Sequence, residues 1–106
     1  MQLNSAIPAA ELTVDHEPAP GGSTTTATAV LGEFAGRELG VWEMTPGTMT
    51  DTEADELFVV LSGSATVEFV DGRPALTLGP GDVVRLGEGT QTVWTVTETL
   101  RKVYLT

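Results

Sequence analysis

The residue with the clearest chemical potential in this sequence is Glu56. It opens an apolar run, ELFVVLSG, that ends at Gly63, and on a strand it would share one face with Phe58 and Val60. A carboxylate in such surroundings either finds a hydrogen-bonding or cationic partner or takes up a proton. Glu56 could therefore accept a hydrogen bond from an amine or amide, or act as a general base.

Other candidate site residues come from further strand-like segments. Lys102 and Tyr104 share one face of the last segment, and Thr92 and Trp94 share one face of another. Together with Trp42 they could line a pocket for a planar or cationic ligand. Core packing of both tryptophans and a surface position for Lys102 are the competing explanations. The residues that we expect at a ligand site are Trp42, Glu56, Phe58, Thr92, Trp94, Lys102 and Tyr104.

Residues able to hold a metal ion are scarce. There is no cysteine, and the only histidine, His16, lies in the N-terminal segment, where we expect it to be solvated. Asp51, Glu53 and Asp55 could together hold a hard cation, but a solvated acidic loop is the simpler interpretation. The sequence therefore predicts neither a metal nor another cofactor.

The segments that must position these residues are short and rich in β-branched and aromatic side chains, which favours strands. Glycine and proline recur between them at the spacing of an all-β sandwich or barrel, and Asp71-Gly72 is the best candidate for a hairpin turn. We divide the chain into an extended N-terminal lead-in, residues 1–28, and a β-barrel domain, residues 29–106. The expected strands are Ala29–Leu31, Leu39–Met44, Leu57–Leu61, Ala65–Val70, Ala75–Leu78, Val83–Leu86, Thr92–Val96 and Leu100–Leu105.

The run Leu57–Leu61 is apolar on both faces, whereas a two-layer sheet usually leaves one face polar. We expect the second face to be covered by the N-terminal segment or by a second subunit. A chain this small has limited means of covering it alone, so the sequence predicts a homodimer.

Composition narrows the range of partners. The chain has 106 residues, which suffices for one domain with a modest core. Fifteen acidic residues against five basic ones leave a net charge of −10, which argues against nucleic acid or anionic membranes as partners. We expect two of the basic residues, Arg73 and Arg101, to be solvated. No apolar run approaches the ~20 residues of a membrane span, and no secretory leader pattern is present, so we expect a cytoplasmic protein.

Four segments carry a family resemblance: GVWEMTPGTM, DELFVVLSGSATV, DGRPALTLGPGDVVRLGEGTQTVWTV and TLRKVYL. Their order resembles the small single-domain cupins, especially the branch with ureidoglycine aminohydrolase-type and ethanolamine-utilisation cupin domains. The resemblance implies a cupin-type double-stranded β-helix, or jelly-roll, barrel. In the first cupin motif a glutamate is followed after six residues by a glycine, and Glu56 and Gly63 fit these positions. The second motif begins at Gly81-Asp82 and passes through Gly89.

The histidines of both motifs are missing. Where the first motif has two of them, the chain offers Met49, Thr50, Asp51 and Thr52, and where the second has one, Thr92 stands. A transition metal requires imidazole nitrogens or several convergent carboxylates. We therefore expect a barrel cavity without a tightly held metal.

Two functions remain open at this point. The first is a small-molecule-binding protein whose pocket is built from Trp42, Glu56, Trp94, Lys102 and Tyr104. The second, implied by the resemblance, is an aminohydrolase-like enzyme that acts on a small nitrogen-containing metabolite, with Glu56 as general base and a weakly held metal. The missing imidazoles favour the first, while a polar cluster inside a barrel keeps the second open.

Overall fold

Strand-forming residues dominate the chain, and the computed structural model, which describes residues 1–106, contains no helix. Accordingly, no helix is long and apolar enough to cross a membrane. The expectation of an all-β fold is confirmed. The strands are β1 (Glu17–Pro18), β2 (Thr25–Phe34), β3 (Arg37–Met44), β4 (Gly47–Thr52), β5 (Glu56–Phe69), β6 (Leu76–Leu78), β7 (Val83–Leu86) and β8 (Gln91–Leu105).

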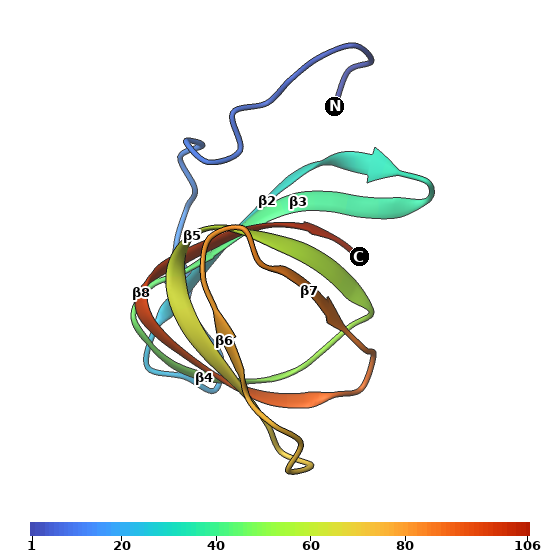
Figure 1. Cartoon of the computed structure of the whole chain (residues 1–106). Coiled ribbons are helices and arrows are strands. Elements are labelled where there is room, and N and C mark those ends of the chain that lie inside the picture. Colours follow the sequence, from blue (N-terminus) through green and yellow to red (C-terminus); the bar gives the residue numbers. More distant parts are fainter.

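Two long strands organise the sheet. β5 and β8 pair with each other, and β8 also pairs with β3 and β4 while β5 pairs with β6 and β7. All these pairs are antiparallel. Because each long strand has two different neighbours along its other edge, the sheet curls round on itself, and Figure 1 looks into the resulting barrel. The β2–β3 hairpin projects beyond one end of it.

β5 and β8 each replace two predicted strands. Leu57–Leu61 and Ala65–Val70 form the single strand β5, and Thr92–Val96 and Leu100–Leu105 lie within β8. The pairing of β5 with β8 shifts register between Val60 and Ala65, so the strands continue through a bulged region instead of ending there. Gly63 lies in that region with φ of 90°, and a Cβ atom on it would lie 2.6 Å from the Leu100 Cα. The motif glycine is thus required for the close approach of the two strands.

For the remaining strands, some of the expected boundaries match the structure and others do not. The strands Leu39–Met44 and Val83–Leu86 are confirmed within two residues. β4 was not expected, because Gly47–Thr52 carries little apolar pattern and is held by pairing with β8. A turn does occur at the Asp71-Gly72 site, where the Gly72 N–H donates to the Phe69 carbonyl at 3.1 Å, but residues 73–75 follow before β6 begins at Leu76.

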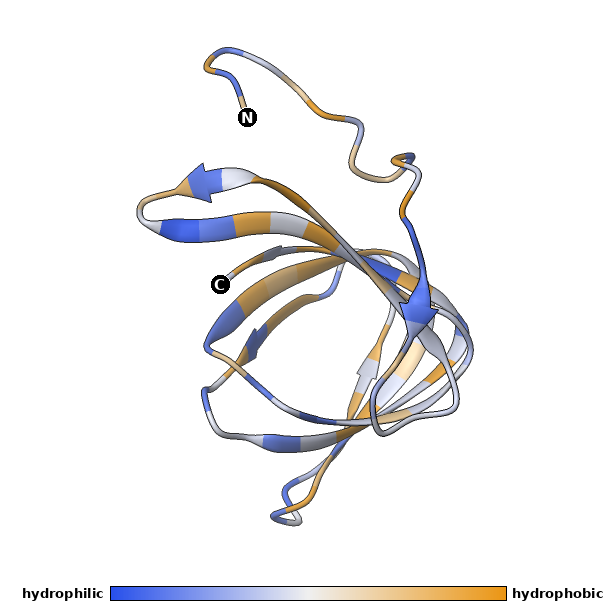
Figure 2. Cartoon of the chain, turned by 180° about the vertical axis from the view of Figure 1, so that it is seen from behind, coloured by the Kyte–Doolittle hydropathy of each residue, from blue (hydrophilic) through white to orange (hydrophobic).

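The barrel interior is apolar. Alternate residues of β5 point inward, and Phe58 and Val60 are each 1% exposed. Trp94 of β8 lies against them, with ring centroids of Trp94 and Phe58 6.0 Å apart. Figure 2 shows apolar stretches along the barrel strands as well as on the N-terminal segment and the β2–β3 hairpin. The buried core is formed by Ala19, Met44, Met49, Phe58, Val60, Ala65, Val67, Leu78, Val84, Leu86, Trp94, Val96, Leu100 and Tyr104.

The N-terminal segment covers part of the outer face of the sheet. Its terminal amino group donates to the Leu31 carbonyl at 2.8 Å, and the Ala9 carbonyl accepts from Arg101 Nη1 at 3.0 Å. Figure 1 shows the segment running beside the β2–β3 hairpin. On the outer face, Leu57 is 44% and Val83 67% exposed. The N-terminal segment is thus bonded to β2 and β8, and it does not cover Leu57 or Val83.

Two charged residues expected in solvent are instead bound at this outer face. Arg101 is 7% exposed, and its Nε donates to Glu43 Oε2 at 2.8 Å. His16 Nε2 lies 2.7 Å from Glu43 Oε1, and its Nδ1 lies 2.9 Å from Thr25 Oγ1. Burial acts to raise the pKa of Glu43, but the bonds from Arg101 and His16 outweigh it and lower that pKa. The prediction of a solvated side chain is thus wrong for Arg101, which is buried under a bond from the N-terminal segment. His16 is exposed, as expected, although it is hydrogen-bonded to Glu43 and Thr25.

A candidate ligand-binding cavity

One end of the barrel interior opens into a cavity of about 330 Å³. Residues from β3, β4, β5 and β8 and from the loop between β4 and β5 line it. Two tryptophans and a tyrosine form part of its wall. Its charged lining consists of one lysine and four carboxylates, namely Lys102, Glu38, Asp51, Glu53 and Glu56.

Lys102 is the only cation in this wall, and it is buried. Its Nζ lies 2.9 Å from Glu56 Oε1, and the two side chains are only 6% and 11% exposed. β8 places Lys102 beside Trp42 of β3 on one side and Val60 of β5 on the other. Glu56, the first residue of β5, is held by pairing with Leu86. The alternative of a surface lysine is wrong, because this register turns its side chain into the barrel.

Three aromatic rings surround the ammonium group of Lys102. Its Nζ lies 4.2 Å from the ring centroid of Phe58, 4.5 Å from that of Trp42 and 5.0 Å from that of Trp94. The two tryptophans meet edge to face, with centroids 5.4 Å apart. Such rings attract a cation through their electron-rich faces. The aromatic box that we expected to hold a ligand therefore holds the protein's own lysine.

Glu53 is a buried site residue that sequence reasoning placed in a solvated loop. It is 6% exposed, and its Oε2 accepts bonds from Thr92 Oγ1 at 2.6 Å and from the indole N–H of Trp94 at 3.0 Å. Its backbone is fixed as well, because its N–H donates to the Thr90 carbonyl and its carbonyl accepts from the Gly89 N–H, both at 2.8 Å. The expected acidic loop is thus pinned against the turn before β8, and Glu53 points inward.

The other acidic residues in or near the wall, Glu38, Asp51 and Asp55, differ in their partners and in their surroundings. Glu38 accepts a bond from the Tyr104 hydroxyl at 2.8 Å, and burial together with this carboxylate raises the pKa of Tyr104. The pKa of Asp51 is also raised, first by desolvation and then by the negative charge of Glu53. Asp55 faces away from the cavity and pairs with Arg85 at 3.3 Å. The prediction of a solvated acidic loop is therefore wrong for Glu53, whereas Asp51 and Asp55 are exposed, Asp51 at the cavity and Asp55 away from it.

Glycine at position 40 makes room for the tyrosine. Gly40 pairs with Tyr104 across β3 and β8, and a Cβ atom at this position would collide with the phenol ring and its hydroxyl. Any larger residue would push Tyr104 away from Glu38. Gly40 is therefore needed to keep Tyr104 in its place in the cavity wall.

The donor set of the cavity does not fit a transition metal. No group of three or more His, Cys, Asp or Glu side chains is arranged to hold an ion. At the positions of the motif histidines, Met49 is buried in the core, Asp51 lines the cavity and Thr92 is used in its bond to Glu53. A thioether, one carboxylate and a committed hydroxyl do not replace three imidazoles.

Comparison with known families now identifies the fold. Residues 31–104 match the family described as the EutQ-like cupin domain. This chain is a EutQ-like cupin. The resemblance seen in the sequence, and the jelly-roll barrel that it implied, are therefore confirmed.

Solved structures similar to this cupin agree with that assignment. The EutQ protein of Clostridium difficile superposes with a TM-score of 0.76 at 22% identity, covering 94% of this chain and 83% of that one. A Rhizobium leguminosarum protein of unknown function gives a TM-score of 0.68 at 28% identity, with coverages of 76% and 78%. The polyketide cyclase RemF of Streptomyces resistomycificus gives 0.69 at 20% identity, with coverages of 97% and 78%. No functionally curated protein matches the sequence significantly.

The cupin fold brings all seven expected site residues to one region. Five of them line the cavity, namely Trp42, Glu56, Trp94, Lys102 and Tyr104. Phe58 and Thr92 lie behind this wall, where they contact Lys102 and Glu53. Sequence reasoning missed Glu38, Asp51 and Glu53 as part of the wall. A two-residue alternation from Met49 through Asp51 to Glu53 was the signal that could have found the last two.

Proposed function

We propose that this cupin binds a small molecule in its barrel cavity without a tightly held metal. The observation that carries the proposal is the Lys102–Glu56 pair, two buried charges 2.9 Å apart in the wall of an open cavity. A buried ion pair is seldom more stabilising than apolar residues of the same volume. Its presence beside a cavity therefore supports a role in binding.

The size of the cavity restricts the ligand. A volume of about 330 Å³ lies at the lower end of the range typical of small-molecule sites, about 300–1,000 Å³. The ligand that fits is of metabolite size. The tryptophans in the wall would report on its arrival, because Trp42 and Trp94 are the only tryptophans of the chain.

The experiment is a titration of the purified protein followed by tryptophan fluorescence and melting temperature. The probes are four-carbon compounds that differ only in charge: butylamine, butyrate and butan-1-ol. We expect at least one to change the fluorescence saturably, and the change to weaken when Glu56 is replaced by Gln. If none of the three binds, or if Glu56→Gln binds the active probe with unchanged affinity, the cavity is not the ligand site.

A second candidate is an enzyme that acts on a small nitrogen-containing metabolite. It is favoured by one feature of Glu56: Lys102 contacts Oε1, so Oε2 is the oxygen able to accept a proton from a substrate or from water. In the aminohydrolase-like reaction, Glu56 would take a proton from water as the oxygen bonds to the substrate carbon, and would return that proton to the departing nitrogen, so that the carbon–nitrogen bond breaks and ammonia is released. A panel of small amides and ureides tests it by ammonia release. Turnover that persists in Glu56→Gln would remove Glu56 from that role.

We also propose that the cupin is a homodimer. Leu57 and Val83 lie on the outer face of neighbouring strands, where Leu57 pairs with Arg85 and Val59 with Val83, and both remain exposed. Light scattering coupled to size exclusion should give twice the chain mass, and Leu57→Glu should shift the protein toward the monomer. A monomer in the unmodified protein at micromolar concentration would contradict the proposal, provided that added salt, which screens the like charges, does not restore association.

A further inference from the structure

The cavity wall carries more negative charge than its own cation can balance. Four carboxylates and one ammonium line it, so their formal charges sum to minus three, since four negative charges stand against one positive charge. Lys102 is committed to Glu56 at 2.9 Å. The surplus is therefore carried by the other three, Glu38, Asp51 and Glu53.

None of these three carboxylates contacts a protein cation. Glu38 accepts from the neutral hydroxyl of Tyr104, and Glu53 accepts from a hydroxyl and an indole N–H. Both bonds to Glu53 fall on Oε2, which leaves its Oε1 without a protein donor although the side chain is more than nine-tenths buried. No fully buried side-chain oxygen of the protein lacks a partner. The free Oε1 is therefore not fully buried, and Glu53 is one of the residues that line the cavity.

The aromatic rings cannot be the place where a ligand cation binds. Lys102 Nζ lies within 5.0 Å of the Phe58, Trp42 and Trp94 ring centroids and occupies the space in front of them. The carboxylates, for their part, are not gathered closely enough to chelate a metal ion. An organic cation suits such a wall better than a metal ion, because an N–H group can form a charge-assisted hydrogen bond to a single carboxylate and does not need several ligands around one centre.

We propose that the ligand carries a positively charged nitrogen, a primary ammonium or an amidinium-type group, which donates hydrogen bonds to acceptors among Asp51, Glu53 and Glu38 at the cavity wall. This inference rests on the proposed binding function and names the class of ligand. Lys102 then serves to hold Glu56 and to fill the aromatic box, and it repels the ligand's cation instead of attracting an anion. The ligand's remaining atoms lie along Trp42 and Tyr104.

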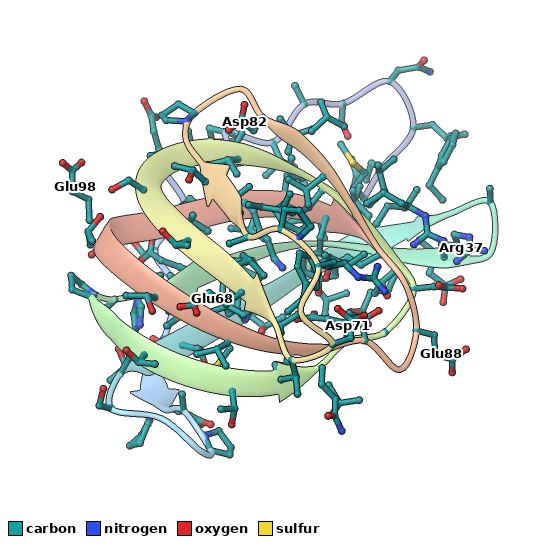
Figure 3. All side chains as sticks on the ribbon, turned by 60° about the horizontal axis from the view of Figure 1, so that its bottom comes forward. Arg37, Glu68, Asp71, Asp82, Glu88 and Glu98 are labelled. Atoms are coloured by element: carbon teal, nitrogen blue, oxygen red, sulfur yellow. The ribbon has the colours of Figure 1, made fainter.

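Calorimetric titration at neutral pH and low salt tests the charge of the ligand. We expect butylammonium to bind, and butan-1-ol and butyrate not to bind. Asp51→Asn should weaken butylammonium by about tenfold, as expected for the loss of one charged hydrogen bond. Glu98→Gln is the matched control, because it removes the same charge from a side chain that Figure 3 shows pointing away from the barrel, and it should leave the affinity unchanged.

Replacement of Lys102 by Met distinguishes most clearly between a cationic and an anionic ligand. It removes the competing cation and frees Glu56, so butylammonium should bind several-fold more tightly to this variant. An anion receptor would behave in the opposite way and lose its ligand. Far-ultraviolet circular dichroism confirms that each variant is folded, and Asp51→Asn, at an exposed strand position, provides the test if Lys102→Met does not fold.

Each other outcome contradicts the inference in a distinguishable way. If butyrate binds and butylammonium does not, the cavity is a binding site but the charge assignment is wrong. If Mg²⁺ or Ca²⁺ displaces butylammonium at equal concentration, the carboxylates form a hard-cation site instead. If equal weakening occurs in Asp51→Asn and Glu98→Gln, the attraction is that of the whole acidic surface. If no probe binds, the proposed binding function fails as well.

Discussion

Arg101 and Lys102 are neighbours on β8, and each is a buried cation paired with a glutamate, yet the two pairs differ in what surrounds them. Arg101 faces the outside of the barrel, where its Nε binds Glu43 at 2.8 Å and its Nη1 binds the Ala9 carbonyl at 3.0 Å. Lys102 faces the inside, where Glu56 lies 2.9 Å away. Successive residues of a strand point to opposite faces, which is why one dipeptide serves both sides of the sheet.

The protein binds all of the charge around the Arg101–Glu43 pair, but not all of the charge around the Lys102–Glu56 pair. Glu43 binds Arg101 through one oxygen and His16 through the other, so both of its oxygens are used by the protein. Around Lys102 the wall retains carboxylates that no protein cation contacts. A buried ion pair is therefore not by itself the mark of a binding site in this molecule. The surplus of unpaired charge beside a cavity distinguishes the inner pair from the outer one.

The largest effect should come from breaking the outer pair. Arg101→Ala leaves Glu43 buried without its main partner and releases the N-terminal segment at Ala9, so it should destabilise the fold by about 3–5 kcal/mol. Urea unfolding measures this. Arg73→Ala is the control, because Arg73 pairs with Asp71 in full solvent and its loss should barely change the midpoint. Equal midpoints for the two variants would show that the outer pair does not hold the segment in place.

Breaking the Lys102–Glu56 pair should destabilise the fold less than breaking the Arg101–Glu43 pair, since the inner pair lies in the wall of an open cavity. Glu56→Gln leaves the Lys102 ammonium without its carboxylate and should lower stability by roughly 2 kcal/mol. The double variant Glu56→Gln, Lys102→Met should be more stable than the sum of the single losses predicts, because no unpaired charge is left. Thermal unfolding of all four proteins completes the cycle. Additive losses would show that the two charges do not stabilise each other.

Acid should weaken the outer pair over a defined range of pH. The folded-state pKa of Glu43 lies below its ordinary value of 4.5, so the pair contributes stability above pH 4.5, and this contribution is lost as the pH falls through the folded pKa. We expect the stability difference between the unmodified protein and Glu43→Gln to shrink as the pH is lowered below 4.5. A difference that stays constant down to pH 3 would mean that folding does not lower the pKa of Glu43.

Of all these perturbations, the addition of a transition metal should have the smallest effect on the protein. The inner wall offers carboxylates but no convergent ligand set and no imidazole. Elemental analysis of protein purified with and without added manganese, zinc or nickel should show well below one equivalent per chain. One tightly held equivalent of metal per chain would instead make the Lys102–Glu56 pair part of a metal centre.

Several errors of sequence reasoning share one physical origin. Glu53 and Arg101 were both expected in solvent, because charged residues usually lie there. Glu53 is instead held by bonds to residues 39 and 41 positions away, and Arg101 by a bond to Glu43, 58 positions away. A local pattern does not contain such contacts. β4 escaped notice for the same reason, because its pairing with β8 and not its own composition makes it a strand.

The sequence by itself determined the all-β class, the cupin resemblance and the inward placement of Glu56 and Phe58, because alternation along a strand and the motif spacing from Glu56 to Gly63 are local properties. Only the tertiary structure decided that Lys102 fills the aromatic box and that Glu53 turns inward to Thr92. The reason is that the sign and balance of charge in a cavity depend on which strands meet there. In this barrel β3, β4, β5 and β8 meet at one end, and each contributes to the wall.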